Sequence, residues 1–556
     1  MAVLARRWPA PTLRPKDSPM SSPYATPTLP GSRDAHDLYL RDPEVVGGDA
    51  AELLDDIGRR LVVVADAEPV PAAGGTLVPA ADAVAGDLPV LGMVAPCGTE
   101  ALGSAAFRRA HGVRLSYVVG EMARGIASAE MVTAAARAGI LSFFGTGGLS
   151  LARVERTVAE LAGRLDGLPW GANLLHNPGE PEVEEATAAL LLEHRVPAVS
   201  ASAFMGLTPA VVRCAAAGLH RGPDGRVQRA TKIMAKVSRP EVARLFLAPA
   251  PEKILRKLVA AGQLTAAEAE LAALVPVAED ITVEGDSGGH TDGRPLPALL
   301  PRMIALRDEV SRQYGYDRRV RLGAAGGLGT PEAVAAAFAL GADYVLTGSI
   351  NQLASEADLS ESAKTLLAAA DIADFTTAPA ADMFEIGARV QVLKKGSRFW
   401  TRAQWLYDRY TAHSGLDELS PADTKKLETE IFGATVDEIW TRTRDFWQDR
   451  DPKQLTRAER DRKHRMALCF RWYLGMSTRW ATEGETERRG DFQLWCGPAM
   501  GAFNHWAGPD IGTPGVVEIA ENLMRGAAVS TRRDAAVRLG VDRVFPPVRY
   551  RSASAV

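Results

Sequence analysis

The chain has 556 residues, of which 46% are apolar and 24% are charged, which are the proportions of an ordinary water-soluble globular protein. Its formal net charge of −4 argues against a general nucleic-acid-binding protein, because neutralising phosphates requires concentrated positive charge. The four cysteines are widely separated and form no CxxC pair, so the sequence indicates neither a zinc site nor a disulfide framework, and no metal ligand set is expected.

The N-terminal part of the chain has no apolar stretch before a cleavage site, and residues 1–35 are rich in proline. We expect a flexible leader there, and we expect no membrane span because no run of about 18 apolar residues occurs. These features are typical of a cytoplasmic protein. Residues 36–110 are predicted to form a small N-terminal region whose fold the sequence leaves open.

From about residue 113, short apolar runs alternate with segments of helical period. The runs are 114–119, 139–144, 170–175, 198–203, 232–237, 280–284, 320–325 and 344–347. Each run is too continuously apolar for a sheet with one wet face, so the pattern favours an α/β fold, a parallel (β/α)8 TIM barrel over residues 111–380. An open doubly wound sheet would give the same local pattern.

Two further regions are predicted around this barrel. Residues 238–279 are longer than a minimal loop and have helical period, which indicates an inserted helical lid or a side subdomain. The repeat stops after residue 350, and residues 381–556 are predicted to be a C-terminal helical region that serves the substrate or a partner.

Glycine-rich turns follow the last two predicted strands. Gly326 and Gly327 follow one strand and precede a helix that opens on Thr330, and Gly348 and Ser349 follow the next strand. Glycines and a helix N-terminus present backbone N–H groups to an anion, and in barrels these two loops commonly build one phosphate site. The alternative for each loop alone is a simple turn of the chain.

Another strand, at 280–284, ends in Glu284 and is followed by Gly288, Gly289 and His290. A Gly-Gly turn allows close approach to a flat ring and projects the imidazole from the catalytic end of a barrel. His290 could there donate a proton or stabilise a developing oxyanion, so it is the candidate catalytic residue. A structural histidine is the competing interpretation.

Three more strand ends suit a flavin ring. Asn173 supplies an amide for a ring edge, and Lys236 could stabilise negative charge on a reduced flavin, unless it is a surface lysine. The first loop, 120–128, includes Ala123 and Gly125 and could lie flat against the ring or simply turn the chain.

Several long stretches resemble one family. They are WGANLLHNPGEPEVEEATAALLLEHRVPAVSASAFM, KIMAKVSRPEVA, EGDSGGHTDGRPLPALLP, GGLGTPEAVAAAFALGADYVLTGSINQ and APAADMFEIGARVQVLKKGSRF. They resemble the nitronate monooxygenase and FMN-dependent enoyl reductase superfamily, and within it the PfaD-type trans-acting enoyl reductases of polyunsaturated fatty acid and polyketide synthases. The likeness covers residues 110–415, with a weaker part at 491–506.

This resemblance implies noncovalent FMN, reduced by NADPH or NADH, and a 2-enoyl thioester substrate. By matched position, Gly326, Gly327, Gly348 and Ser349 would hold the phosphate. Asn173, Lys236 and Glu284 would surround the flavin, and His290 would lie near its ring. The first loop departs from the family because Glu121 stands where a small residue is expected.

The same resemblance implies an acyl carrier protein with a phosphopantetheine-bound acyl chain, and other synthase subunits, as partners. Lys394, Lys395, Arg398 and Arg402, or the stretch 457–465, could receive an acidic carrier, although a solvated helix face explains either cluster. Oligomeric state stays open, with a homodimer as one option. The alternatives are a nitronate monooxygenase that lets oxygen reoxidise the flavin, and an inactive barrel that acts as a synthase scaffold.

Overall fold

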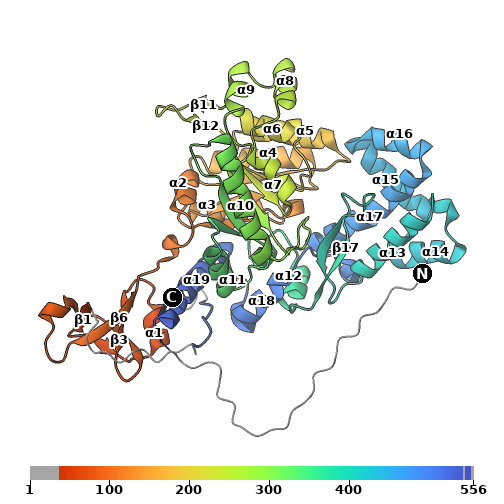
Figure 1. Ribbon diagram of the computed structural model, residues 1–556. Helices are drawn as coiled ribbons and strands as arrows, with labels where there is room; N and C mark the ends of the chain where they lie inside the picture. The colour runs from red at the N-terminus through yellow and green to blue at the C-terminus, as the bar shows by residue number, and fades with distance from the viewer. Residues whose placement is uncertain (1–36, 542–544, 552–556) are drawn as a thin grey trace, which may run out of the picture.

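Eight parallel strands close into a barrel at the centre of the molecule, as seen in a computed structural model that describes residues 37–541 and 545–551 (Figure 1). The strands are β7 (Tyr117–Val119), β8 (Leu141–Phe144), β9 (Gly171–Leu175), β10 (Ala198–Ser202), β13 (Lys232–Val237), β14 (Asp280–Glu284), β15 (Arg321–Ala325) and β16 (Tyr344–Thr347). All eight predicted strands are confirmed, and β16 pairs with β7 to close the barrel. The leader predicted over 1–35 lies outside the described residues.

Helices surround the barrel because the segments between strands have one apolar face each. They are α3 (Ala129–Arg137), α4 (Leu151–Arg164), α5 (Pro181–Glu193), α6 (Pro209–Ala216), α7 (Pro240–Leu247), α10 (Leu296–Tyr314), α11 (Pro331–Ala339) and α12 (Glu361–Ala368). Val154, Val158 and Leu161 of α4 show this pattern: they are three or four residues apart and buried.

The amino-terminal end of the barrel is closed by α2 (Ala105–His111). Phe107 stacks on Tyr344 inside the barrel, with ring centroids 4.4 Å apart. His111 Nε2 lies 2.9 Å from Asp280 Oδ2, and Arg321 binds the same buried carboxylate. Because this end is plugged by side chains, the carboxyl ends of the strands are left to form a site.

The helical insertion contains α7, α8 (Glu252–Ala260) and α9 (Ala266–Ala272). Helices α8 and α9 pack on α6. Of the two predicted alternatives, a lid or a side subdomain, they therefore form the side subdomain. The cover over the carboxyl ends of the strands comes instead from α15 (Val436–Arg450) and α17 (Arg462–Glu483), whose residues line the cavity there. The chain passes away from the cavity at 238–279 because the apolar face of α8, with Leu255 and Leu258, is buried against the barrel's outer helices.

The region after residue 380 is mainly helical, as predicted for 381–556, although it opens on a two-stranded hairpin. A hairpin of β17 (Phe375–Pro379) and β18 (Arg389–Leu393) crosses that boundary, and Val390 and Val392 of β18 alternate into the core. The other elements are α13 (Phe399–Ala412), α14 (Pro421–Lys426), a π-helical turn (Leu427–Phe432), α16 (Pro452–Arg460), α18 (Ala499–Ala507) and α19 (Val516–Arg538). None of the helices in the described part of the chain is long and apolar enough to cross a membrane.

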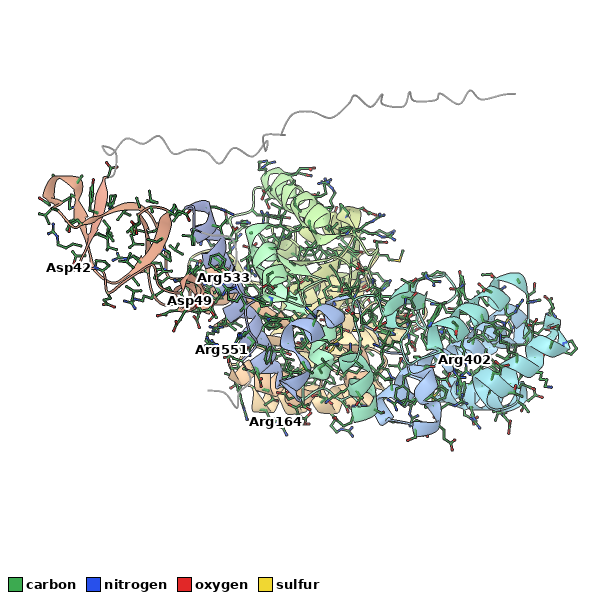
Figure 2. The ribbon with its side chains drawn as sticks, turned by 90° about the horizontal axis from the view of Figure 1, so that it is seen from below. Asp42, Asp49, Arg164, Arg402, Arg533 and Arg551 are labelled. Atoms are coloured by element: carbon green, nitrogen blue, oxygen red, sulfur yellow. The ribbon has the colours of Figure 1, made fainter. Side chains whose placement is uncertain are left out.

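Residues 38–94 form a separate antiparallel sheet of six strands that the sequence did not specify. Its order is β2 (Val45–Val46), β4 (Pro69–Ala73), β3 (Leu61–Ala65), β6 (Leu88–Val94), β1 (Leu38–Arg41), β5 (Thr76–Pro79), and α1 (Ala50–Asp55) packs beside it. Helix α19 joins this sheet to the barrel, because it packs on α11 and its Ala536 is in one apolar cluster with Leu54 and Leu61. Figure 2 shows Arg533 of α19 at this junction, where it donates to Asp55.

Candidate functional site

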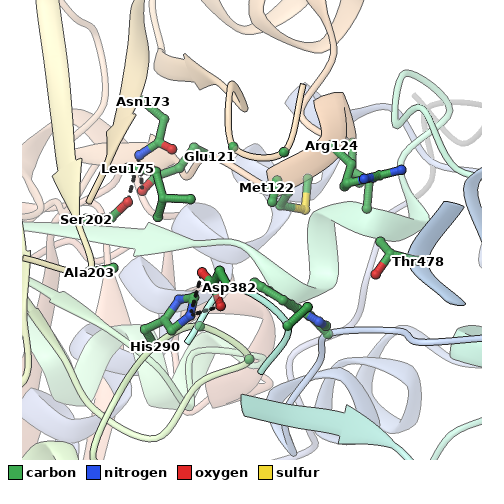
Figure 3. A pocket seen from close by; sticks show the side chains of 18 of the residues that line it. Glu121, Met122, Arg124, Asn173, Leu175, Ser202, Ala203, His290, Asp382 and Thr478 are labelled. Carbon is green, nitrogen blue, oxygen red and sulfur yellow. Dashed lines mark hydrogen bonds and ion pairs between the residues drawn. The ribbon is translucent and has the colours of Figure 1, made fainter. Parts of the chain in front are cut away.

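A cavity of about 450 Å³ opens at the carboxyl ends of the barrel strands, between the barrel loops and helices α15 and α17 (Figure 3). The predicted site residues that line it are Ala123, Asn173, Lys236, Glu284, Gly288, Gly289, His290, Gly326, Gly327, Gly348 and Ser349. Gly125 is the exception. It is buried with φ +76° and its N–H donates to Gly145 O, so it turns the first loop and does not face the cavity.

The two glycine loops after β15 and β16 form a cradle with room for a small group. Gly326 has φ +88°, and a Cβ there would lie 2.7 Å from Asp286 O, so only glycine fits that turn. Gly327 and Gly348 differ, because a Cβ on either would meet no atom within 4 Å. Helix α11 begins beside them, capped by the Thr330 hydroxyl, which accepts from Ala333 N. Open space next to glycine loops and a helix N-terminus suits a phosphate group.

Three charged side chains meet on one wall of the cavity. Lys236 Nζ lies 3.2 Å from Glu121 Oε1 and 3.5 Å from Glu284 Oε1, and all three side chains are nearly buried. Burial alone would lower the pKa of Lys236, but the two carboxylates more than offset it and that pKa lies above the ordinary lysine value. Lys236 is therefore a fixed positive charge rather than a surface lysine.

One buried oxygen of Glu121 is of special interest. Its Oε2 has no hydrogen-bond partner among the described residues. A buried carboxylate oxygen without a donor is costly, so this atom marks a position where a bound group with an N–H or O–H fits. The residue that departs from the family pattern in the sequence is thus part of the charged wall.

His290 is held by a carboxylate from the hairpin. Its Nε2 lies 3.1 Å from Asp382 Oδ1, and its ring meets Trp495 edge-on, with centroids 5.5 Å apart (Figure 3). Burial lowers the pKa of His290, but the charge of Asp382 and its hydrogen bond outweigh burial, so the pKa is raised above the ordinary histidine value. The imidazole is therefore stabilised as a cation at the edge of the cavity, which suits a proton donor.

The Gly-Gly turn before His290 is packed against the C-terminal segment. A Cβ on Gly288 would lie 2.9 Å from Cys496 N. Ser287 Oγ donates to Glu284 Oε1 at 2.9 Å and accepts from Gly289 N, which fixes the turn over the charged wall. The weakly similar stretch at 491–506 is thus built into the site.

Asn173 lies beside Glu121 and is 3% exposed, so nearly all of it is committed to the fold. Its Nδ2 donates to Ser200 O at 3.0 Å and to Ser202 Oγ at 2.7 Å. The amide nitrogen is therefore already used, and the oxygen is the end of this side chain that remains for a ligand.

Sequence reasoning missed the residues that the C-terminal region supplies. Asp382 lies in the loop of the hairpin, and Trp447, Arg471 and Trp472 come from α15 and α17. The motif containing Asp382, APAADMFEIGARVQVLKKG, carries part of the family resemblance but indicates no role for this residue. The aromatic residues have only a helical context in the sequence, which a core explains equally well.

Several residues of the two basic clusters form ion pairs within the chain. Arg402 contacts the buried Asp491, and Lys395 Nζ lies 3.1 Å from Asp374. In the second cluster Arg462 contacts Asp417 and Glu418. These pairs favour the alternative of solvated structural faces over a carrier-binding patch.

Comparison with known proteins identifies two matching family models. The nitronate monooxygenase model matches residues 112–397, slightly more than half of the chain. The inserted helical domain of [acyl-carrier-protein] S-malonyltransferase matches residues 413–492, which hold α14 to α17.

Individual relatives match over most of this chain. It is 44% identical over 454 residues to one of the polyunsaturated fatty acid synthase subunits of Thraustochytrium sp., and the match covers 80% of this chain and 30% of that relative. It is 47% identical over 408 residues to the polyketide biosynthesis protein PksE of Bacillus subtilis, covering 73% of this chain and 53% of that protein. The chain thus spans only about a third to a half of these two relatives.

Among solved structures, the enoyl reductase domain of MlnA, from the macrolactin biosynthesis cluster of Bacillus amyloliquefaciens, is 38% identical, with a TM-score of 0.75. The match covers 79% of this chain and the whole of that domain. The barrel, the site and these matches together show that the chain belongs to the nitronate monooxygenase family. Within that family its place is with the PfaD-type enoyl reductases of polyunsaturated fatty acid and polyketide synthases.

Proposed function

We propose that this protein is an FMN-dependent, trans-acting enoyl reductase that uses NADPH or NADH to reduce 2-enoyl thioesters carried on an acyl carrier protein. The observation that carries the proposal is the meeting, in one cavity, of an open glycine cradle, a buried lysine between two carboxylates and a histidine paired with Asp382. Flavin-linked reduction requires a site for the FMN phosphate, a positive charge near the reacting groups and a proton donor, and these three features would supply them in that order.

The residues present fit FMN. The cradle of Gly327, Gly348 and Ser349 has room for the phosphate, and the charged wall of Lys236 and Glu121 has a cation and a free acceptor for the ring system. When bound, FMN would take two electrons from the nicotinamide and pass them, as a hydride equivalent, to the β-carbon of the enoyl thioester.

The chain's own residues orient the substrate and supply the proton. His290, whose cationic form is favoured by the Asp382 carboxylate at Nε2, donates its Nδ1 proton toward the α-carbon and is reprotonated from solvent. Lys236 stabilises negative charge that develops in the cavity. The sum is enoyl thioester, NAD(P)H and one proton giving saturated thioester and NAD(P)+.

The cover of α15 and α17 suits a long acyl chain. The wall that these helices give the cavity contains several apolar and aromatic side chains, namely Phe446, Trp447, Leu468, Trp472 and Met476. An acyl chain gains free energy from burial against such a wall, at about 25 cal/mol per Å² of apolar surface. The match of this segment to a helical insertion in acyl-carrier-protein malonyltransferases supports a carrier-bound substrate.

A nitronate monooxygenase is the second candidate, since the family model that matches the barrel carries that name. A small nitronate would leave the aromatic wall of α15 and α17 without a role. Steady-state assays separate the two. The proposal requires NAD(P)H-dependent reduction of crotonyl thioesters without oxygen, and oxygen uptake with an alkyl nitronate as the only activity would contradict it. A purified chain that neither holds nor takes up FMN would instead favour the inactive scaffold.

A further inference from the structure

One cation in the cavity has no counter-ion within the described part of the chain. Arg124 lines the cavity and is half-buried, and its guanidinium makes no hydrogen bond or ion pair with the residues described at 37–541 and 545–551. In Figure 3 it lies with Thr478 on the side of the view away from Asn173. A guanidinium in this state is a receptor for an anion, since it presents several donors and cannot lose its proton.

The arginines next to Arg124 each have a carboxylate partner. Arg153 is 2.9 Å from Asp358, Arg479 is 2.7 Å from Glu483, and Arg450 contacts Glu180. Burial lowers the pKa of Arg124, and the positive charges of Arg479 and Arg450 lower it further. Arg450 and Arg479 also line the cavity, but each has a carboxylate partner, so the charge of Arg124 is the one that a bound anion would balance in this group.

The backbone holds Arg124 in an unfavourable conformation. Its φ is +62°, which is uncommon for a residue other than glycine. Arg124 N donates to Gly147 O at 2.7 Å, and a Cβ on Gly148 would lie 3.0 Å from Arg124 Cδ, so the side chain lies across the loop that follows β8. Left-handed backbone at a non-glycine residue is commonly kept for function, because the fold must hold it there.

We propose that Arg124 binds a phosphate ester of the reactants at the end of the cavity under α17. This inference rests on the proposed function and extends it to a specificity-determining residue. The phosphate has two sources in the reaction: the phosphopantetheine arm of the acyl carrier, or the adenosine 2′-phosphate of NADPH. In each molecule a flexible linker separates this phosphate from the reacting atoms, and either phosphate is a suitable ligand for the guanidinium.

The test is a calorimetric titration, which needs no turnover. FMN-loaded full-length protein is titrated with butyryl-phosphopantetheine and butyryl-pantetheine, and separately with NADP+ and NAD+, which carry the same phosphate difference but cannot reduce the flavin. Wild type is expected to prefer the phosphate-bearing member of one pair at least about tenfold. Arg124→Gln is expected to abolish that preference, and the pair affected identifies the source. Arg153→Gln removes a neighbouring arginine that already has a partner, and it should keep the preference.

Arg124→Gly guards against misfolding, because glycine adopts a positive φ without strain. It should fold as well as wild type and lose the same preference. The inference is overturned if wild type shows no phosphate preference in either pair, or if both Arg124 variants retain it. A protein that shows the Arg124-dependent preference but reduces no enoyl thioester would contradict the proposed function and leave the anion site standing.

Discussion

His290 Nε2 and Asp382 Oδ1 lie 3.1 Å apart although 92 positions separate the two residues in the chain. The histidine follows barrel strand β14, whereas the aspartate belongs to the β17–β18 hairpin beyond the barrel. The C-terminal region therefore supplies a carboxylate to the candidate site as well as covering the cavity.

Asp382→Asn is expected to lower kcat/KM about 10- to 100-fold near neutral pH. Burial lowers the pKa of His290, and in wild type the charge of Asp382 overcomes that effect. Without the charge the pKa falls, so the protonated form is lost at lower pH and the alkaline limb of the pH–kcat/KM profile moves to lower pH. Asp374→Asn is the control. It removes the partner of Lys395 in the turn before β17 and should leave the pH profile unchanged. An unmoved alkaline limb in Asp382→Asn would contradict the assigned role.

Lys236→Met is expected to destabilise the fold by about 3–5 kcal/mol at neutral pH, because it leaves Glu121 and Glu284 buried together without a cation. Adding Glu121→Gln should recover part of this loss. Urea denaturation of the flavin-free protein measures both. Lys364→Met is the control, since Lys364 is also buried but its carboxylate partner, Glu361, is exposed. Equal losses for the two lysines would show that the charged wall has no special energetic role.

Gly348→Val tests the phosphate cradle without straining the backbone. The φ of Gly348 is −129° and no atom lies within 4 Å of a Cβ there, so the flavin-free fold should change by no more than about 0.5 kcal/mol. FMN affinity should fall at least about 100-fold, because the side chain fills the space for the phosphate. Equilibrium dialysis with FMN measures this, and Gly163→Ala on α4 is a control outside the cavity. Unchanged FMN affinity in Gly348→Val would place the phosphate elsewhere.

Trp447→Ala is expected to raise KM for a ten-carbon enoyl thioester more than KM for the crotonyl thioester, by about tenfold. Trp447 is 5% exposed and lines the cavity from α15, so its loss removes apolar surface that only a longer chain reaches. Trp405→Ala deletes an equally large side chain on α13, outside the cavity lining, and should affect both substrates alike. The same change in KM for both chain lengths in Trp447→Ala would show that this wall does not contact the acyl chain.

The barrel could be predicted from sequence because each of its strands is buried on both sides and leaves a continuous apolar run. The cradle at Gly326 and Gly348 was predictable for a related reason: glycines at strand ends are local signals. The role of Asp382 could not be predicted, because nothing in the sequence around a loop carboxylate indicates which distant residue it contacts. The N-terminal sheet also escaped prediction, because strands such as β5 and β6 are only partly buried and Pro- and Gly-rich turns join its strands.

The position of the cover shows the same limit. Helical period in 238–279 and in 436–483 is equally clear, but period does not say which helix lies over the carboxyl ends of the strands. That depends on tertiary packing, in which α8 and α9 contact α6 while α15 and α17 reach the cavity.

The absorbance spectrum of the purified protein, taken without oxygen, tests the central claim most directly. We predict flavin bands that bleach on addition of NADPH or NADH and return on addition of crotonyl thioester alone. If the bands bleach but return only with oxygen or a nitronate, the enoyl reductase assignment is wrong. A colourless protein that also fails to bind added FMN would contradict the flavin itself.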